Sequence, residues 1–210
     1  MKRHFEDGAR ETPGAADGRE RLAGFLATLA GLLDRPRDDE TTLLEQGAKA
    51  LASLVRHDDW LEDEFARCNA GRYRQYLLYC DPLRRFSVVS FVWGPGQRTP
   101  IHNHTTWGLI GMLRGAEISE SFELRDGVPV ANGQERLEPG DVTAVSPTIG
   151  DIHRVRNAYA DKVSISIHAY GGDIGAIERQ VFEPAGGVSA FRSGYSNRFL
   201  PNVWGLSELR

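Results

Sequence analysis

The spacing of apolar residues changes near residue 70. Before that point, apolar residues recur every three or four positions, which predicts amphipathic helices. The first helix carries one apolar face made of Leu22, Phe25, Leu26, Leu29, Leu32 and Leu33. It ends at Arg35-Pro36, because the residue before a proline avoids helical geometry. A second helix is predicted from about Thr41, and its inward face holds Leu43, Leu44, Ala48, Leu51, Leu54 and Val55. A short third helix is predicted from Asp58 through Arg67.

After Arg72 the chain consists of short runs rich in β-branched and aromatic residues, separated by Gly, Pro and Asn. Such runs predict strands. The predicted strands cover residues 76–79, 86–93, 107–113, 116–124, 142–145, 152–156 and 163–170. Turn signals, among them Asn132-Gly133, separate them. Many short strands with regular turns favour a sandwich or a closed barrel such as a jelly roll.

These patterns divide the 210 residues into one domain with an added helical segment. Residues 1–19, rich in Gly, Ala and charged side chains, are predicted to be a mobile tail. Residues 20–70 form a helical segment that packs on the barrel, and residues 71–210 form the barrel with a C-terminal extension. In that extension the side chains expected to cap the barrel are Phe182, Phe191, Tyr195, Phe199 and Trp204.

Composition narrows the class of protein. The net charge of −4 leaves no basic footprint for nucleic acid. No apolar run approaches the ~20 residues of a membrane span, and the N-terminus lacks the apolar core of a secretory signal. Cys68 and Cys80 are too few for a disulfide scaffold, so we expect reduced thiols in a cytoplasmic protein. The sequence does not specify an oligomeric state.

Candidate chemistry centres on three histidines. In the run Pro100-Ile101-His102-Asn103-His104, the two imidazoles stand at i and i+2, so on a strand they point to the same face. His153 follows far downstream, in Gly150-Asp151-Ile152-His153. Three imidazole nitrogens can hold a first-row metal and leave positions open for substrate. Taken alone, His102 and His104 are equally consistent with surface histidines on a strand.

The spacing around these histidines resembles the two sequence blocks of the cupin superfamily. The first block reads G-x5-H-x-H-x3/4-E-x6-G, and Gly96, His102, His104 and Gly115 match it. The second reads G-x5-P-x-G-x2-H-x3-N, and Gly150, His153 and Asn157 match it, whereas the gaps before Pro147 and before Gly150 are each one residue longer than in the block. The resemblance covers about the last two-thirds of the chain. It implies a mainly β fold, the cupin double-stranded β-helix, preceded by two or three N-terminal α-helices.

Gly108 stands where the first block has its glutamate, so the implied metal set is three neutral histidines. Together with Ser166-Ile167-His168-Ala169-Tyr170, this resembles cysteine dioxygenase type I and its bacterial thiol dioxygenase relatives. The resemblance implies one Fe(II) per chain, held by His102, His104 and His153. It implies addition of both atoms of O2 to the sulfur of a small thiol carboxylate, giving a sulfinate.

The resemblance also assigns a hydrogen-bonded relay to Ser166, His168 and Tyr170. These three alternate along one strand, so they share a face. Mammalian members of the family carry a cysteine that crosslinks to the relay tyrosine. Gly108 aligns with that cysteine, so no Cys–Tyr crosslink is expected with Tyr170.

Two further residues concern the substrate. Gln75 aligns with the arginine that binds the substrate carboxylate in the family, which resembles the Gln-type enzymes that prefer 3-mercaptopropionate. Arg74 is the neighbouring residue, so a register shift of one position would reverse this inference. In Gln-type enzymes a later arginine handles the carboxylate, and Arg179 is the candidate here. Both Gln75 and Arg179 are equally consistent with ordinary polar positions.

Two other functions are compatible with the motifs. One is a different metal-dependent cupin enzyme, such as a zinc or manganese isomerase or another oxygenase. The other is a non-catalytic cupin that binds a metal or a small ligand. The alternation of Ser166, His168 and Tyr170 favours the thiol dioxygenase over both.

Overall fold

The structure is a computed structural model of the chain, and it describes residues 13–34 and 40–201. The N-terminal part contains the helices α1 (Pro13–Leu33) and α2 (Glu40–Val55) and the short 3-10 helix η1 (Asp63–Ala66). The strands that follow are β1 (Arg74–Cys80), β2 (Phe86–Trp93), β3 (Ile101–His102), β4 (Gly108–Arg114), β5 (Glu117–Arg125), β6 (Val128–Leu137), β7 (Val142–Val145), β8 (His153–Asn157), β9 (Ser164–Gly171), β10 (Arg179–Phe182) and β11 (Val188–Phe191).

The strands pair as nested antiparallel hairpins. β5 pairs with β6, β4 with β7, β3 with β8, and β2 with β9. Further pairing of β4 with β9 and of β5 with β8 folds this long hairpin into two facing sheets. The sheets have the orders β1-β2-β9-β4-β7 and β11-β10-β3-β8-β5-β6. This nesting is the jelly-roll arrangement, so the predicted fold class is confirmed.

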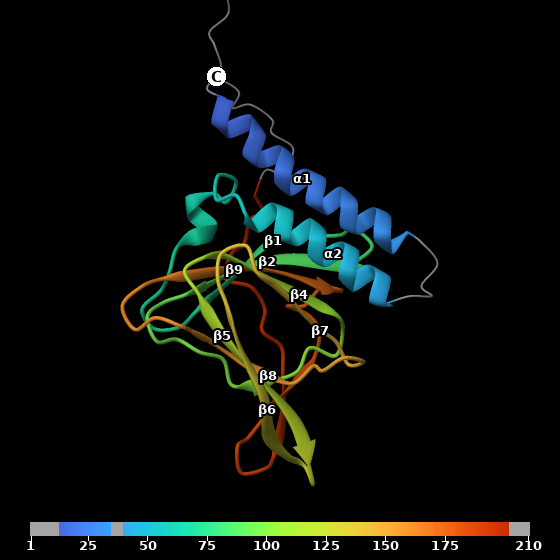
Figure 1. Ribbon diagram of the computed structural model, residues 1–210, viewed down its shortest axis with the longest axis vertical. Coiled ribbons are helices and arrows are strands. Elements are labelled where there is room, and N and C mark those ends of the chain that lie inside the picture. Colours follow the sequence, from blue (N-terminus) through green and yellow to red (C-terminus); the bar gives the residue numbers. More distant parts are fainter. Residues whose placement is uncertain (1–12, 35–39, 202–210) are drawn as a thin grey trace, which may run out of the picture.

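Helices α1 and α2 lie together across the outer face of the five-stranded sheet (Figure 1). Close packing there depends on small residues: a Cβ at Gly111 of β4 would lie 2.8 Å from Leu51 Cγ of α2. Strand β9 is buried on both of its faces. Ile165, Ile167 and Ala169 join the core beneath the helices, and the alternate positions point into the barrel. The relay residues therefore face the interior because β9 is regular.

The N-terminal predictions are confirmed in type and corrected in extent. Helix α1 ends at Leu33, before the predicted stop at Arg35-Pro36, which lies outside the described residues. The helix already begins at Pro13, so residues 13–19, predicted to be tail, are helical. The predicted third helix is wrong apart from η1. Two of its acidic residues instead form ion pairs, Asp58 with Arg114 and Asp59 with Arg21, while Trp60 and Leu61 are buried.

All seven predicted strands are present with small shifts at their ends. Strands β6, β10 and β11 were not predicted, and β3 was expected only from the run around His102 and His104. β6 is mostly exposed and polar, so it lacks an apolar alternation. Asn132-Gly133 makes no turn: Ser121 pairs with Gly133 and Phe122 with Ala131, which leaves Asn132 as a β-bulge.

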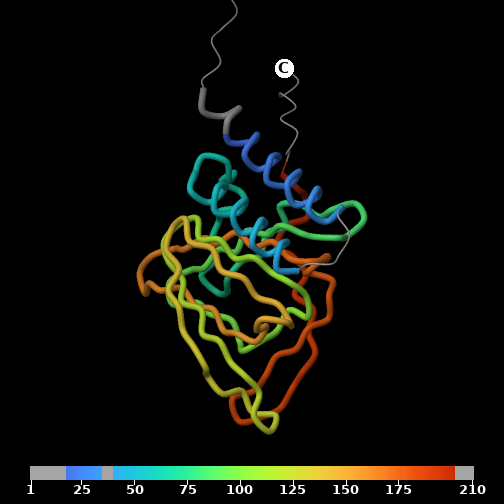
Figure 2. Tube along the Cα trace, turned by 45° about the vertical axis from the view of Figure 1, so that its right-hand side comes forward, coloured from blue at the N-terminus to red at the C-terminus, as the bar shows by residue number. Residues whose placement is uncertain are grey.

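The C-terminal extension contributes more than the predicted cap. After β9 it runs down the barrel beside the β5–β6 hairpin (Figure 2) and adds β10 next to β3. Phe182 is buried and Tyr195 packs inside the barrel, as the cap requires. Phe199 is 79% exposed and does not cap anything, and Trp204 lies outside the described residues. Neither helix among the described residues is long and apolar enough to cross a membrane.

Candidate metal centre

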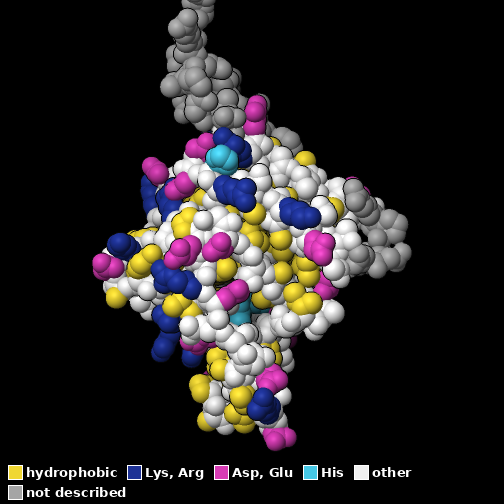
Figure 3. Space-filling view, viewed as in Figure 1, with side chains coloured by type: hydrophobic (Ala, Val, Ile, Leu, Met, Phe, Trp, Pro, Cys, Tyr) yellow, Lys and Arg dark blue, Asp and Glu magenta, His cyan; other side chains and the backbone are white. Residues whose placement is uncertain are grey.

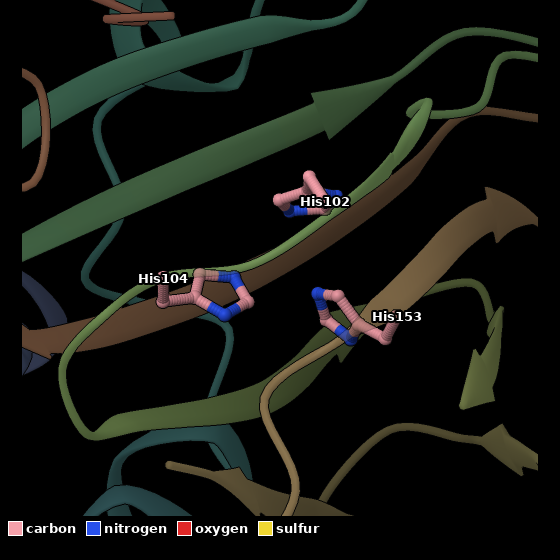
Figure 4. Close-up of side chains that lie close together, drawn as sticks. All are labelled: His102, His104 and His153. Carbon is pink, nitrogen blue, oxygen red and sulfur yellow. The ribbon is translucent and has the colours of Figure 1, made fainter. Parts of the chain in front are cut away.

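The three predicted histidines converge inside the barrel. His102 ends β3, His153 begins β8 directly opposite it, and His104 stands two residues beyond the end of β3. One ligand nitrogen from each ring lies within 4.8 Å of the others, and all three side chains are buried (Figure 4). The expectation that both His102 and His104 belong to a strand is wrong. His104 reaches the cluster from a loop, in which Thr105 adopts a left-handed φ of 59°.

Each imidazole is held through its Nδ1 atom. His102 Nδ1 lies 3.1 Å from the Pro100 carbonyl, and His104 Nδ1 lies 2.9 Å from Asp151 Oδ1. Because a carbonyl and a carboxylate only accept, these Nδ1 atoms carry the proton and the Nε2 atoms hold the lone pair. His153 Nδ1 lies 3.3 Å from Ser119 Oγ. Partners of this kind orient metal-bound histidines.

The cluster fits a metal ion. His104 Nε2 is buried and has no hydrogen-bond partner among the described residues, which is costly unless a ligand occupies that direction. Burial lowers the pKa of His102 and His153 well below the usual value, with a smaller contribution from neighbouring histidines. Burial also lowers the pKa of His104, and Asp151 opposes this shift. The rings are therefore neutral near pH 7, the state that binds metals.

A chain of hydrogen bonds runs along β9 beside the cluster. Ser166 Oγ lies 2.8 Å from His168 Nε2, and His168 Nδ1 lies 2.7 Å from the Tyr170 hydroxyl. The Tyr170 ring stacks on His104 at 5.1 Å between centroids, so the chain ends against the histidine cluster. Burial raises the pKa of Tyr170, which keeps its hydroxyl protonated. Burial likewise keeps His168 neutral by lowering its pKa.

Two buried side chains stand at the other end of this chain. The Trp93 indole Nε1–H donates to Ser166 Oγ at 3.1 Å. Glu117, on β5 of the opposite sheet, is fully buried, and neither of its carboxylate oxygens has a hydrogen-bond partner among the described residues. Ser166 and Trp93 face it and act to lower its pKa, but burial dominates and raises the pKa of Glu117 to about 7.

Arg179 and Gln75 meet through one serine. Arg179 Nη2 donates to Ser193 Oγ at 2.6 Å, and Gln75 Nε2 donates to the same oxygen at 3.0 Å. Gln75 is buried and Arg74 is not, so the structure joins Gln75 rather than Arg74 to this network.

Arg179 is a buried cation without a carboxylate partner. Its side chain is 4% exposed, its Nε has no hydrogen-bond partner, and it forms no ion pair with any of the described residues. Its positive charge lowers the pKa of His102, His104 and His153, so it faces the cluster. Burying an unpaired charge is expensive, and a bound anion would remove that cost.

The walls of the site are crowded at one point and open at another. A Cβ at Gly108 would lie 2.7 Å from two carbons of the Tyr170 ring, so only glycine fits beneath that ring as it stands. His153 also lines a surface cavity of about 430 Å³, together with Ser119, Val145 and Ile149. Figure 3 shows hydrophobic side chains gathered near the middle of one face, where histidine atoms are also visible.

Sequence reasoning missed four residues of this site: Ser119, Asp151, Ser193 and Glu117. Asp151 stood inside the quoted Gly150-Asp151-Ile152-His153 run, two positions before a ligand, which was a usable signal. Glu117 carries no such signal, because the start of β5 reads Glu-Ile-Ser-Glu-Ser and holds another glutamate, Glu120, three residues later. Ser119 and Ser193 carry no local signal, because serines are common throughout the chain.

Comparisons with known proteins give only partial similarities. No protein-family model matches the chain. Cysteine dioxygenase type 1 of Danio rerio is 25% identical over 118 residues, covering 53% of this chain and 56% of the relative. The chain thus spans about half the length of this curated relative.

Solved structures show weak likenesses. One is a conserved protein with a double-stranded β-helix domain from Klebsiella pneumoniae, with TM-score 0.42, 16% identity, and coverage of 64% of this chain and 96% of that one. Another is a cupin superfamily protein from Desulfitobacterium hafniense, with TM-score 0.39, 20% identity, and coverage of 59% and 88%. The nested strand pairing itself defines the fold, a double-stranded β-helix, and the three histidines inside it form a site compatible with metal binding.

Proposed function

We propose that this protein is a non-haem Fe(II) thiol dioxygenase that adds both atoms of O2 to the sulfur of a small thiol carboxylate, giving the sulfinate. The observation that carries the proposal is the chain Ser166–His168–Tyr170, which ends against His104 of the three-histidine cluster. This chain favours a catalytic site over a non-catalytic metal-binding cupin. The partial similarity to a cysteine dioxygenase supports the same reaction class.

His102, His104 and His153 would hold the ferrous ion through their Nε2 atoms. The bound ion would supply the redox chemistry that joins O2 to a thiolate, along with open coordination positions. Three neutral ligands leave the charge of the ion uncompensated, which favours a substrate that binds as an anion. Tyr170, protonated at neutral pH, can donate a hydrogen bond toward the reacting atoms.

Arg179 is the proposed partner of the substrate carboxylate. A guanidinium binds a carboxylate with two parallel hydrogen bonds, and the Nε of Arg179 is unused. Gln75 holds Ser193, which in turn holds Arg179, so Gln75 positions the arginine. The proposed order of preference is 3-mercaptopropionate, then L-cysteine, then mercaptosuccinate.

The test is O2 consumption by anaerobically Fe(II)-loaded protein with these three thiols, compared by kcat/KM, with the product identified by mass. We expect 3-mercaptopropionate to gain two oxygen atoms with one O2 consumed per thiol. A preference for L-cysteine would overturn the role of Gln75 and keep the reaction class. No thiol-dependent O2 uptake in iron-containing protein would overturn the proposal and favour the other cupin functions.

A matched pair of variants tests the carboxylate site. Arg179→Gln should raise KM for 3-mercaptopropionate by roughly 10- to 100-fold, because one charge-assisted contact is lost. Arg192→Gln removes an exposed arginine that pairs with Glu178, so its KM should equal that of the wild type. Equal KM values for Arg179→Gln and wild type would exclude Arg179 as the carboxylate partner.

A further inference from the structure

Glu117 is the most unusual buried group of the molecule that the mechanism does not use. Its side chain is fully buried and its carboxylate oxygens lack hydrogen-bond partners among the described residues. A buried carboxylic acid normally finds a partner, because desolvation without compensation is costly. Ala116, the residue before Glu117, exchanges two hydrogen bonds with the Ser164 hydroxyl of β9, two residues before Ser166. This contact brings Glu117 close to Ser166 and Trp93, the first members of the chain that ends at Tyr170, and both act on its pKa.

The chain has two possible directions. The Trp93 indole N–H can only donate, so Ser166 Oγ accepts this hydrogen bond with one of its two lone pairs. The remaining Ser166 proton can go to His168 Nε2 or to Glu117. His168 sits between two hydroxyls, at 2.8 Å and 2.7 Å, and a neutral imidazole must donate at one nitrogen and accept at the other.

Each direction corresponds to one state of Glu117. A neutral Glu117 can donate to Ser166, which then donates to His168 Nε2, so His168 donates from Nδ1 and leaves the Tyr170 proton free to point into the site. An ionised Glu117 only accepts, so it takes the Ser166 proton. His168 must then donate from Nε2, and the Tyr170 proton turns back toward Nδ1. We propose that Glu117 is a positioning residue whose protonation selects the tautomer of His168 and the direction in which Tyr170 donates.

The surroundings of Glu117 allow both states near neutral pH. Burial raises its pKa to about 7, Glu135 on β6 raises it further, and Ser166 and Trp93 lower it. Asn157 of β8, opposite Glu117 in the sheet, is uncharged and bonded elsewhere. Tyr170 is the other titratable group that responds to Glu117, and burial keeps Tyr170 protonated throughout this range.

The test is nitrogen NMR of the full chain with 15N-labelled histidine, freed of metal by chelation, from about pH 5.5 to about pH 8.5, a range that brackets the pKa of Glu117 near 7. The His168 signals are assigned by their loss in His168→Asn. We expect the Nδ1–H tautomer at low pH and the Nε2–H tautomer at high pH. One unchanged tautomer across the whole range in the wild type would overturn the proposal.

Variants separate Glu117 from the other titrating groups. Glu117→Gln keeps a donor toward Ser166 and cannot ionise, so His168 should stay in the Nδ1–H form at every pH. Glu123→Gln, on the same strand with a half-exposed side chain paired to Arg125, should switch as the wild type does. A Glu117→Gln protein that still switches would overturn the proposal. If this variant fails to fold, 13C labelling of the Glu117 carboxyl in the wild type must show an ionisation that coincides with the tautomer change.

The consequence for catalysis rests on the proposed function. If Tyr170 must donate into the site, kcat for 3-mercaptopropionate should fall as the pH rises through about 7 in the wild type and stay level in Glu117→Gln, with KM unchanged in both. A protein with no thiol-dependent O2 uptake would overturn the dioxygenase and leave the tautomer result intact. An unchanged tautomer in an active enzyme would overturn only the role of Glu117.

Discussion

The two sheets of the barrel both place histidines in its interior, and they use them differently. In the six-stranded sheet and its adjoining loop, His102, His104 and His153 each have Nδ1 held by an oxygen, which leaves Nε2 available. In the five-stranded sheet, His168 is equally buried, but both of its ring nitrogens lie against hydroxyls of the same strand. All four residues are therefore buried histidines. The metal-ligand candidates each keep one ring nitrogen free, whereas the relay histidine, His168, keeps none.

The source of the partners explains this difference. The partners of His168 stand two residues away on either side, at positions that the strand itself brings onto one face. The partners of His104 and His153 come from other segments: Asp151 lies 47 residues from His104, and Ser119 lies 34 residues from His153. A relay can be built by one strand, whereas a metal site needs several chain segments to meet.

The largest effect is expected from removing one histidine of the metal-binding cluster. His153→Ala should abolish stoichiometric Fe(II) binding, because two remaining imidazoles cannot complete the set. His168→Ala should retain the metal, since neither of its nitrogens is free. Metal content after equilibration with Fe(II) and gel filtration measures both. His57→Ala, an exposed position, is the control, and a metal-free His168→Ala protein would contradict the comparison.

The next effect concerns the relay alone. Tyr170→Phe removes the terminal hydroxyl and should lower kcat by roughly 100- to 1000-fold, the cost of losing one donor to a reacting group. Fe(II) content should stay at the wild-type level, because Tyr170 is stacked on His104 rather than bonded to a ligand nitrogen. Equal loss of metal and turnover would show that Tyr170 supports the cluster instead of the chemistry.

Glu117 is a fully buried carboxyl group on β5, and its ionisation should affect stability. Its pKa rises from the ordinary value of 4.5 to about 7 on folding, so the folded protein binds the proton more tightly. The proton on Glu117 therefore contributes to the free energy of unfolding in full below about pH 4.5, and this contribution is lost as the pH rises through about 7. The full loss is about 3 kcal/mol. Urea unfolding should show that Glu117→Gln stabilises the protein at pH 8 by more than at pH 5. The same change at both pH values would contradict this.

A smaller effect is expected from the residue that orients His104. Asp151 accepts from His104 Nδ1 and from the backbone amides of His104 and Thr105. Asp151→Asn removes the charge that raises ligand basicity, so Fe(II) affinity should fall by about 10- to 100-fold. Competition with a chelator measures this affinity, and Asp161→Asn, at an exposed position, should leave it unchanged.

The smallest effect tests the packing of the relay. Gly108→Ala places a Cβ 2.7 Å from the Tyr170 ring, which must shift, at a cost of about 1–3 kcal/mol in unfolding free energy. Gly31→Ala, on α1 with open space around it, should be neutral or stabilising. Thermal unfolding compares the two variants. Equal Tm values would mean that the Tyr170 ring has room to move.

Short-range patterns predicted more of this protein than long-range ones. Two helices and seven strands followed from apolar spacing, because periods of 3.6 and 2 are set by local backbone geometry. The strand pattern left a sandwich or a closed barrel open, and the motif resemblance favoured the double-stranded β-helix. The unpredicted strands have physical reasons for being missed. β6 is polar and exposed, and β10 and β11 are held mainly by pairing with each other and with β3.

The sequence by itself determined which side chains could carry chemistry: the spacing of His102, His104 and His153, and the alternation of Ser166, His168 and Tyr170. The tertiary structure decided which atoms of these side chains remain free to bind a metal or to donate a proton. It oriented His104 with Asp151, joined Gln75 to Arg179 through Ser193, residues more than a hundred positions apart, and set Glu117 against Ser166. Such contacts depend on how the two sheets close over one another, and no local period encodes that closure.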